Sequence, residues 1–147
     1  MTNPTKFFTK VFFAIATTLV VSSLSFAHHG DAGRYEDEPI TVSGTVVTLQ
    51  FMNPHSRLIL DVTDENGETV RWHAEFGNPN RMNSEFGWTR ETLKPGDRVT
   101  LLGRRLKSGA PYLNLTERAR VVLTDTGTEI YRTRNFRDAD TPRPERS

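Results

Sequence analysis

The segment 56–76 places the strongest constraint on the fold. Two runs in which apolar and polar residues alternate, 56–62 and 69–76, lie on either side of Asn66 and Gly67. Alternation with a period of two is typical of strands that bury one face. The Asn-Gly pair tolerates the positive φ angles that a tight hairpin turn requires. The segment therefore predicts a β-hairpin.

Three further segments have strand character: 40–51, 97–106 and 110–123. In the first of them, the apolar positions change from one face to the other after Gly44 and Val46, which predicts a strand that bends at a glycine or a bulge. The last two are joined by a short turn that contains glycine, so we expect them to form a second hairpin.

Residues 77–96 read as a loop with one or two short helical turns, because Asn78 can cap a helix that has Pro79 at its first position. Five strands, arranged three and two around a short helix, predict an all-β, OB-like Greek-key barrel. The predicted core positions are Val42, Val46, Leu58, Leu60, Val70, Trp72, Val99, Leu101, Leu113 and Leu115.

The first 27 residues have the character of a secretory signal peptide. Lys6 and Lys10 precede an apolar run over 11–24, and Ser25 and Ala27 are small residues suited to a cleavage site. The run is too short to span a membrane, so we expect no transmembrane anchor after cleavage. The expected location is periplasmic or secreted.

Cleavage after Ala27 divides the chain into a signal peptide (1–27), an extended arm (28–39), the barrel (40–124) and a polar, partly disordered tail (125–147). Removal of Lys6 and Lys10 lowers the basic count from 19 to 17 against 18 acids, which gives a net charge of −1. A near-neutral exported domain argues against nucleic acid as a partner.

Four segments carry a resemblance to a known family: the post-signal motif AHHG, the NPH motif at 53–55, RWHAEF (71–76) and GWTRETLKPGDRVTLLG (87–103). Together they resemble a family of small exported bacterial proteins, domain of unknown function 6152, over roughly residues 27–123. The resemblance implies export and a small β domain. It implies no activity, substrate or catalytic residue.

Three of the four histidines, His28, His29 and His55, lie in these two motifs, and the chain has no cysteine. After cleavage, His28 carries a free α-amine beside its imidazole, which is a bidentate chelate. Copper(II) favours tetragonal nitrogen ligation. We therefore expect His28 and His55 to bind copper, with His29 as a further candidate ligand and His73 as a weaker one.

The alternative function is a protein- or oligosaccharide-interaction module without metal, in which Asn53 to His55 only form a turn. A copper-dependent oxidative enzyme is a third possibility. No catalytic residues are assigned, because no nucleophile motif, phosphate loop or HExxH helix is present in the sequence. Enzymatic activity is left open, and a binding role is favoured.

Overall fold

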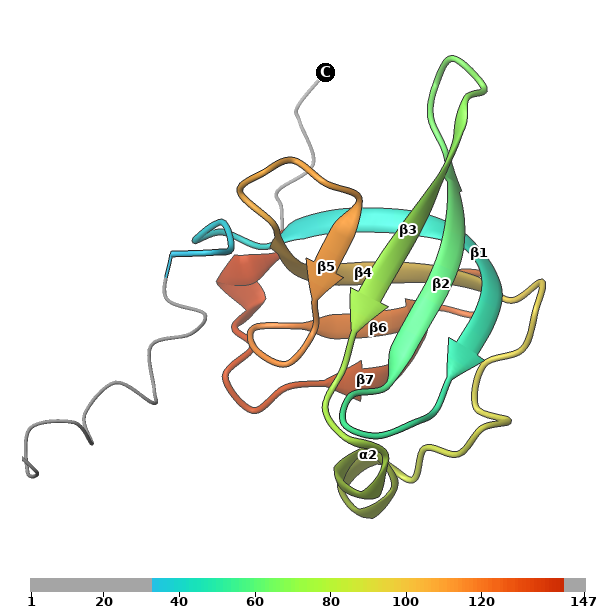
Figure 1. Ribbon diagram of the computed structural model, residues 1–147, viewed down its shortest axis with the longest axis vertical. Helices are drawn as coiled ribbons and strands as arrows, with labels where there is room; N and C mark the ends of the chain where they lie inside the picture. Colours follow the sequence, from blue (N-terminus) through green and yellow to red (C-terminus); the bar gives the residue numbers. More distant parts are fainter. Residues whose placement is uncertain (1–32, 142–147) are drawn as a thin grey trace, which may run out of the picture. The chain divides into compact units, whose positions relative to one another are not determined.

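The computed structural model describes residues 33–141, which form a mostly β structure (Figure 1). The elements in chain order are β1 (Ile40–Gln50), β2 (Arg57–Thr63), β3 (Thr69–Glu75), α2 (Pro79–Phe86), β4 (Arg98–Arg105), β5 (Tyr112–Asn114), β6 (Arg120–Leu123), β7 (Thr128–Arg132) and a short 3-10 helix (Asp138–Asp140).

Five of the strands close into a barrel. They pair in the order β1-β2-β3-β5-β4, and an additional β1–β4 pairing completes the circle. The β3–β5 pair is parallel, whereas the other pairs are antiparallel. With α2 between β3 and β4, this arrangement confirms the predicted OB-like barrel.

Strand β1 bends, as the change of its apolar face predicted. Its first half pairs with β4 and its second half with β2, and the β2 register shifts between Val46 and Thr48, where Val47 forms a bulge. A Cβ atom on Gly44 would lie 2.6 Å from the carbonyl oxygen of Asp61. Glycine therefore permits the close approach of β1 and β2 at the point where β1 changes partner.

The β2–β3 hairpin is also confirmed. Gly67 has a φ of +82°, and the Asp64 carboxylate accepts hydrogen bonds from the backbone N–H groups of Asn66 and Glu68, both at 2.9 Å. The tip of the hairpin projects beyond the barrel (Figure 1). Val70 lies near this tip and is 46% exposed, so its assignment to the core was wrong.

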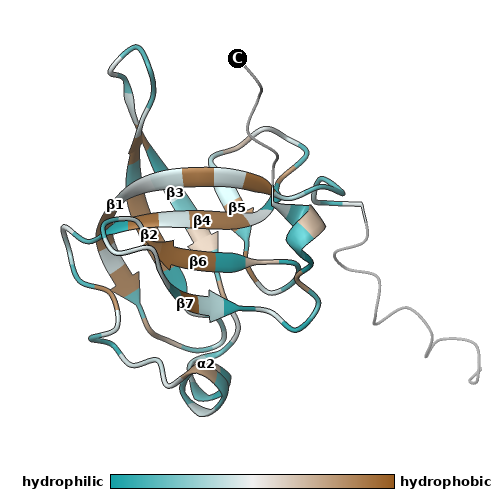
Figure 2. Cartoon of the chain, turned by 180° about the vertical axis from the view of Figure 1, so that it is seen from behind, coloured by the Kyte–Doolittle hydropathy of each residue, from teal (hydrophilic) through white to brown (hydrophobic). Residues whose placement is uncertain are grey.

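Apolar residues are concentrated on the strands, whereas the hairpin tip and most loops are polar (Figure 2). Among the predicted core residues, Trp72 is partly buried and packs against the core, Val70 is exposed, and the other eight are buried. The structure adds Phe76, Met82, Trp88, Leu93 and Tyr131 to this core.

The helix α2 begins as the sequence predicted. The Asn78 side chain accepts a hydrogen bond from the backbone N–H of Arg81 at 2.9 Å, and Pro79 occupies the first turn. Gly87 ends the helix in the left-handed conformation. Met82 is the buried residue of α2, and it anchors the helix to the core.

The segment 110–123 was predicted as one strand, but the structure divides it into β5 and β6. Arg118 has a φ of +48° between them. Strand β6 pairs with β4 and carries β7 on its other edge. Strand β7 lies in the predicted tail, where we expected no strand, and its Tyr131 is buried in the core. Residues 142–147 lie outside the described residues.

Candidate functional site around His55

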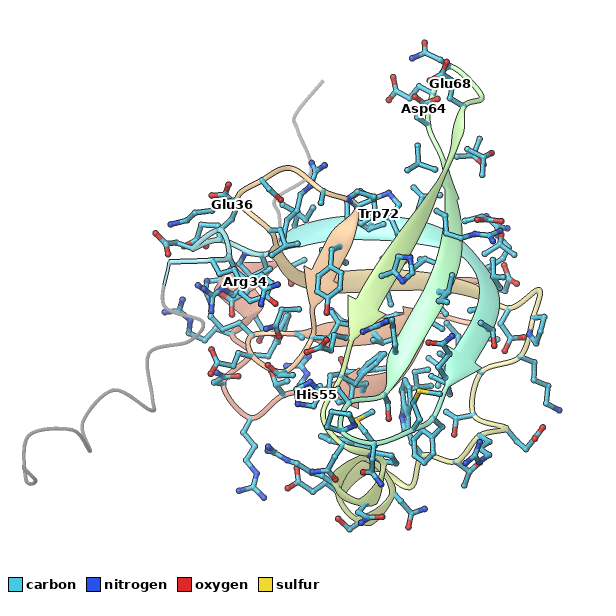
Figure 3. The ribbon with its side chains drawn as sticks, viewed as in Figure 1. Arg34, Glu36, His55, Asp64, Glu68 and Trp72 are labelled. Atoms are coloured by element: carbon cyan, nitrogen blue, oxygen red, sulfur yellow. The ribbon has the colours of Figure 1, made fainter. Side chains whose placement is uncertain are left out.

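His55 lies in the loop that leads into β2, close to α2 in the view of Figure 3. Its ring nitrogen Nδ1 is 2.8 Å from Oε1 of Glu75, the last residue of β3. The imidazole is 52% exposed and the carboxylate 18% exposed. Because an ionised carboxylate can only accept, Nδ1 carries the proton in this contact.

The two strands that flank β3 both contribute a contact to Glu75. Arg57 lies opposite Glu75 in the β2–β3 register, with 4.0 Å between the guanidinium and the carboxylate. From β5, the Tyr112 hydroxyl donates a hydrogen bond to Oε2 of Glu75. Burial, followed by the bond to Glu75, raises the pKa of Tyr112 well above its ordinary value. The hydroxyl therefore remains a donor over the physiological pH range.

This arrangement fixes the orientation and the tautomer of His55. With the Nδ1 proton directed to Glu75, the lone pair of Nε2 is free, and no hydrogen bond to Nε2 occurs within residues 33–141. Histidines that bind metals usually donate their second ring N–H to a carboxylate, which orients the ring and increases its basicity. His55 is thus arranged as a metal-binding histidine would be.

In the two residues that follow His55 in the sequence, two buried polar atoms have no hydrogen-bond partner in the described part of the chain: Oγ of Ser56 and Nε of Arg57. Ser56 is completely buried, although its backbone N–H donates to the carbonyl of Gly77 at 3.0 Å. Buried polar groups are nearly always paired. Of the two residues, Arg57 bears on the site, because its guanidinium lies 4.0 Å from the Glu75 carboxylate that contacts His55.

The described part of the arm docks onto the barrel. Tyr35 is buried and forms an isolated bridge with Leu106, and the backbone N–H of Glu36 donates to the carbonyl of Arg105 at 2.8 Å. Tyr35 also contributes to the raised pKa of Tyr112, so the arm passes near the strand that supports Glu75.

Of the three predicted ligands, only His55 can be placed, because His28 and His29 lie outside the described residues. Within 33–141, no group of three or more His, Cys, Asp or Glu side chains is positioned to hold a metal ion. His73 lies on the same strand as Glu75 and is partly buried.

Sequence reasoning did not identify Glu75 and Tyr112 as partners of this site. Alternation had placed Glu75 on the outer face of its strand. Arg57 and Glu75 are opposite each other because Thr63 pairs with Thr69, a register that alternation alone does not fix. The contact from Tyr112 depends on the parallel β3–β5 pairing, which joins strands distant in the sequence.

The fold and the site define a small OB-like β-barrel protein. The chain belongs to the family of unknown function DUF6152, whose model matches residues 17–112. The earlier resemblance is confirmed. No curated protein matches the chain. Between residues 33 and 141, no helix is long and apolar enough to cross a membrane.

Proposed function

We propose that this protein is exported and binds copper(II) through His55 together with the mature N-terminal residue, His28. The observation that carries the proposal is the contact between Nδ1 of His55 and Glu75, because it leaves Nε2 available as a ligand on an exposed and oriented ring.

The signal-like segment supports the second part of the proposal. Cleavage after Ala27 gives His28 a free α-amine, so that one residue offers two nitrogen ligands. Together with Nε2 of His55, this set consists of three nitrogen donors, which suits the tetragonal preference of copper(II). His29 offers a further imidazole next to the chelate.

The proposal sets a condition on chain length. The described arm begins at Gly33, and the five residues that precede it can extend by up to ~17 Å, so His55 must lie within that reach. The arm is anchored at Tyr35, which influences Tyr112, and Tyr112 in turn holds the carboxylate that orients His55.

Copper titration of correctly processed, untagged protein tests the proposal. We expect His55→Ala to weaken binding by at least tenfold. Glu75→Gln should weaken it by about 10- to 100-fold, because the supporting carboxylate is lost. Affinity should also fall with decreasing pH, since the imidazoles and the α-amine bind the metal only when deprotonated.

The matched control is His73→Ala, which removes an imidazole that is not part of the proposed ligand set and should therefore leave copper affinity unchanged. Equal affinities of the wild type and His55→Ala would contradict the proposal. In that case the interaction module without metal becomes the better account of the barrel. Mass spectrometry of the exported protein must first establish that the chain begins at His28.

A further inference from the structure

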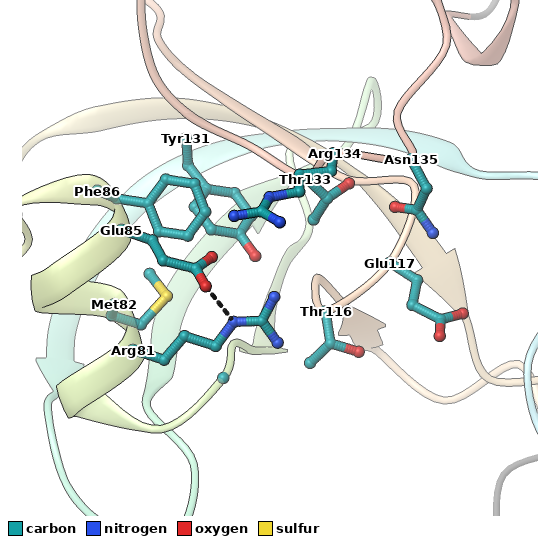
Figure 4. Close-up of a pocket in the computed structure, with 11 residues that line it drawn as sticks. Arg81, Met82, Glu85, Phe86, Thr116, Glu117, Tyr131, Thr133, Arg134 and Asn135 are labelled. Carbon is teal, nitrogen blue, oxygen red and sulfur yellow. Dashed lines mark hydrogen bonds and ion pairs between the residues drawn. The ribbon is translucent and has the colours of Figure 1, made fainter.

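A second candidate site lies between α2 and the segment that follows β7. It is a cavity of about 260 Å³ (Figure 4). Its apolar wall is formed by Phe86 and Tyr131, whose ring centroids are 4.6 Å apart, together with the buried Met82. Small-molecule sites of proteins combine such an apolar wall with a few polar groups.

Two guanidinium groups project into this cavity, Arg81 from α2 and Arg134 from the segment after β7 (Figure 4). Arg134 is exposed and makes no hydrogen bond or ion pair within the described residues. Arg81 pairs with Glu85 at 3.2 Å, but both side chains are accessible to solvent, so the pair is weak. Both arginines are therefore available to an anionic group, and guanidinium is well matched to carboxylate.

The other side of the cavity carries acceptors. Glu117 and Asn135 lie across from the α2 side chains (Figure 4). The Glu117 carboxylate is 62% exposed, and among the described residues it has one long ion pair, to Arg104 at 3.4 Å. Asn135 is held in place because its Oδ1 accepts the backbone N–H of Arg118 at 2.9 Å. A cationic group in the cavity would thus meet a carboxylate on this side.

The two threonines of the cavity are already engaged within the protein. Oγ1 of Thr116 donates to the Asn114 side chain at 2.7 Å, and Oγ1 of Thr133 accepts from the backbone N–H of Ala119 at 2.9 Å. The groups left to recognise a ligand are therefore the charged ones: Arg81 and Arg134, with the Glu85 carboxylate beside Arg81, and Glu117 across the cavity.

We propose that this cavity binds a small zwitterion, a free amino acid or a dipeptide. Its carboxylate would contact Arg81 and Arg134, its ammonium group Glu117, and its apolar side chain the aromatic wall. The volume suits a ligand of this size, since it lies just below the usual range of about 300–1,000 Å³ for small-molecule pockets. The site uses none of His28, His29 and His55, so it is independent of the copper proposal.

Calorimetric titration with L-leucine, L-phenylalanine and the dipeptide leucyl-leucine tests this site. We expect saturable binding of at least one of these probes. Two analogues of leucine isolate its charges: 4-methylpentanoate lacks the amine, and 3-methylbutylamine lacks the carboxylate. If leucine is the ligand, each analogue should bind at least tenfold more weakly. Absence of binding by all three probes, or equal binding of 4-methylpentanoate and leucine, would overturn the proposal.

Variants locate the binding to this cavity. Arg134→Gln should weaken binding of leucine by at least tenfold. Glu117→Gln should weaken binding of leucine but leave binding of 4-methylpentanoate unchanged, because that analogue has no ammonium group. Arg90→Gln is the matched control, because Arg90 is exposed in the loop after Trp88 and does not line the cavity. Since all three side chains are on the surface, the variants should fold, which circular dichroism can verify. Unchanged affinity of Arg134→Gln would overturn the assignment.

Discussion

At the scale of single residues, Leu60 shows how the barrel core is built. In the registers of β2 with its two neighbours, Leu60 lies opposite Val46 on one side and Trp72 on the other. Its side chain is completely buried. Because it contacts two strands, its removal should leave a cavity that neither strand can fill alone.

We predict that Leu60→Ala lowers the free energy of unfolding by about 2–5 kcal/mol, through lost apolar burial and the remaining cavity. Urea denaturation followed by tryptophan fluorescence measures this change. Val70→Ala serves as the control, since Val70 is largely exposed and surface substitutions usually change stability by about 0.5 kcal/mol or less. Comparable decreases in the free energy of unfolding of the two variants would show that Leu60 is not a major part of the core.

The same two residues show what alternation can predict. It placed Leu60 and Val70 on the inner face of their strands, but only Leu60 is buried. A period of two determines which face a side chain lies on, yet it does not determine how far a strand extends beyond the strands that would cover it. The candidate site shows a similar division. His55 could be selected from the sequence by its chemistry, but the bond from Tyr112 to Glu75 could not be predicted, because it depends on the pairing of distant strands.

At the scale of elements, β1 is the strand that closes the barrel. It can pair with β4 and β2 in succession because Gly44 lets its backbone approach Asp61 and because Val47 forms a bulge. A side chain at Gly44 would meet backbone rather than the flexible end of another side chain, so the neighbouring atoms cannot easily move away.

Gly44→Ala should therefore destabilise the protein by about 1–3 kcal/mol, the usual cost of overpacking. Thermal or urea unfolding measures the loss. Thr41→Ala, at an exposed position of the same strand, should change stability much less. A stable Gly44→Ala variant would mean that β1 and β2 separate at this point without cost.

The order of elements could largely be predicted from the sequence, since the hairpin, the bend of β1 and the cap of α2 each have a local signature. No local signature predicted the division of 110–123 into two strands or the existence of β7. Strand β7 has only Ile130 and Tyr131 as apolar residues, and it is held by pairing with β6 and by the bond from the Trp88 indole to the Ile130 carbonyl at 2.9 Å. Such tertiary contacts cannot be read from a short polar segment.

At the scale of the whole described molecule, Arg118 joins the arm to the C-terminal segment. Its guanidinium donates to the Asp37 carbonyl at 2.6 Å, to the Glu38 carboxylate at 3.0 Å and to the buried Asp140 carboxylate. The bond from Arg118 is the main reason that the pKa of Asp140 falls to about 2. Arg137 assists through its backbone and side chain.

This lowered pKa predicts a pH dependence. A carboxylate whose pKa is lower in the folded than in the unfolded state contributes stability above its unfolded pKa of about 3.9, and the contribution is lost as pH falls through the folded value. We expect the free energy of unfolding to decrease between about pH 4 and pH 2, and Asp140→Asn to reduce this dependence.

Measurement of urea unfolding at several pH values provides the test. Asp138→Asn is a suitable control, because the Asp138 side chain is almost fully exposed and its contact within residues 33–141 is a 3.4 Å ion pair with Arg132. The variant should keep the pH dependence of the wild type. An identical profile for Asp140→Asn and wild type would show that other carboxylates account for acid sensitivity.

The position of β1 in the barrel also affects the order in which the strands pair when the chain folds. Ile40 pairs with Gly103, so the first strand must wait for the fourth before it has both of its neighbours. During synthesis, which proceeds from the N-terminus, the hairpin of β2 and β3 can form from local contacts, but the first half of β1 has no partner until β4 is available. We therefore expect closure to be a late step, during which the unpaired edge of β1 is exposed to other chains.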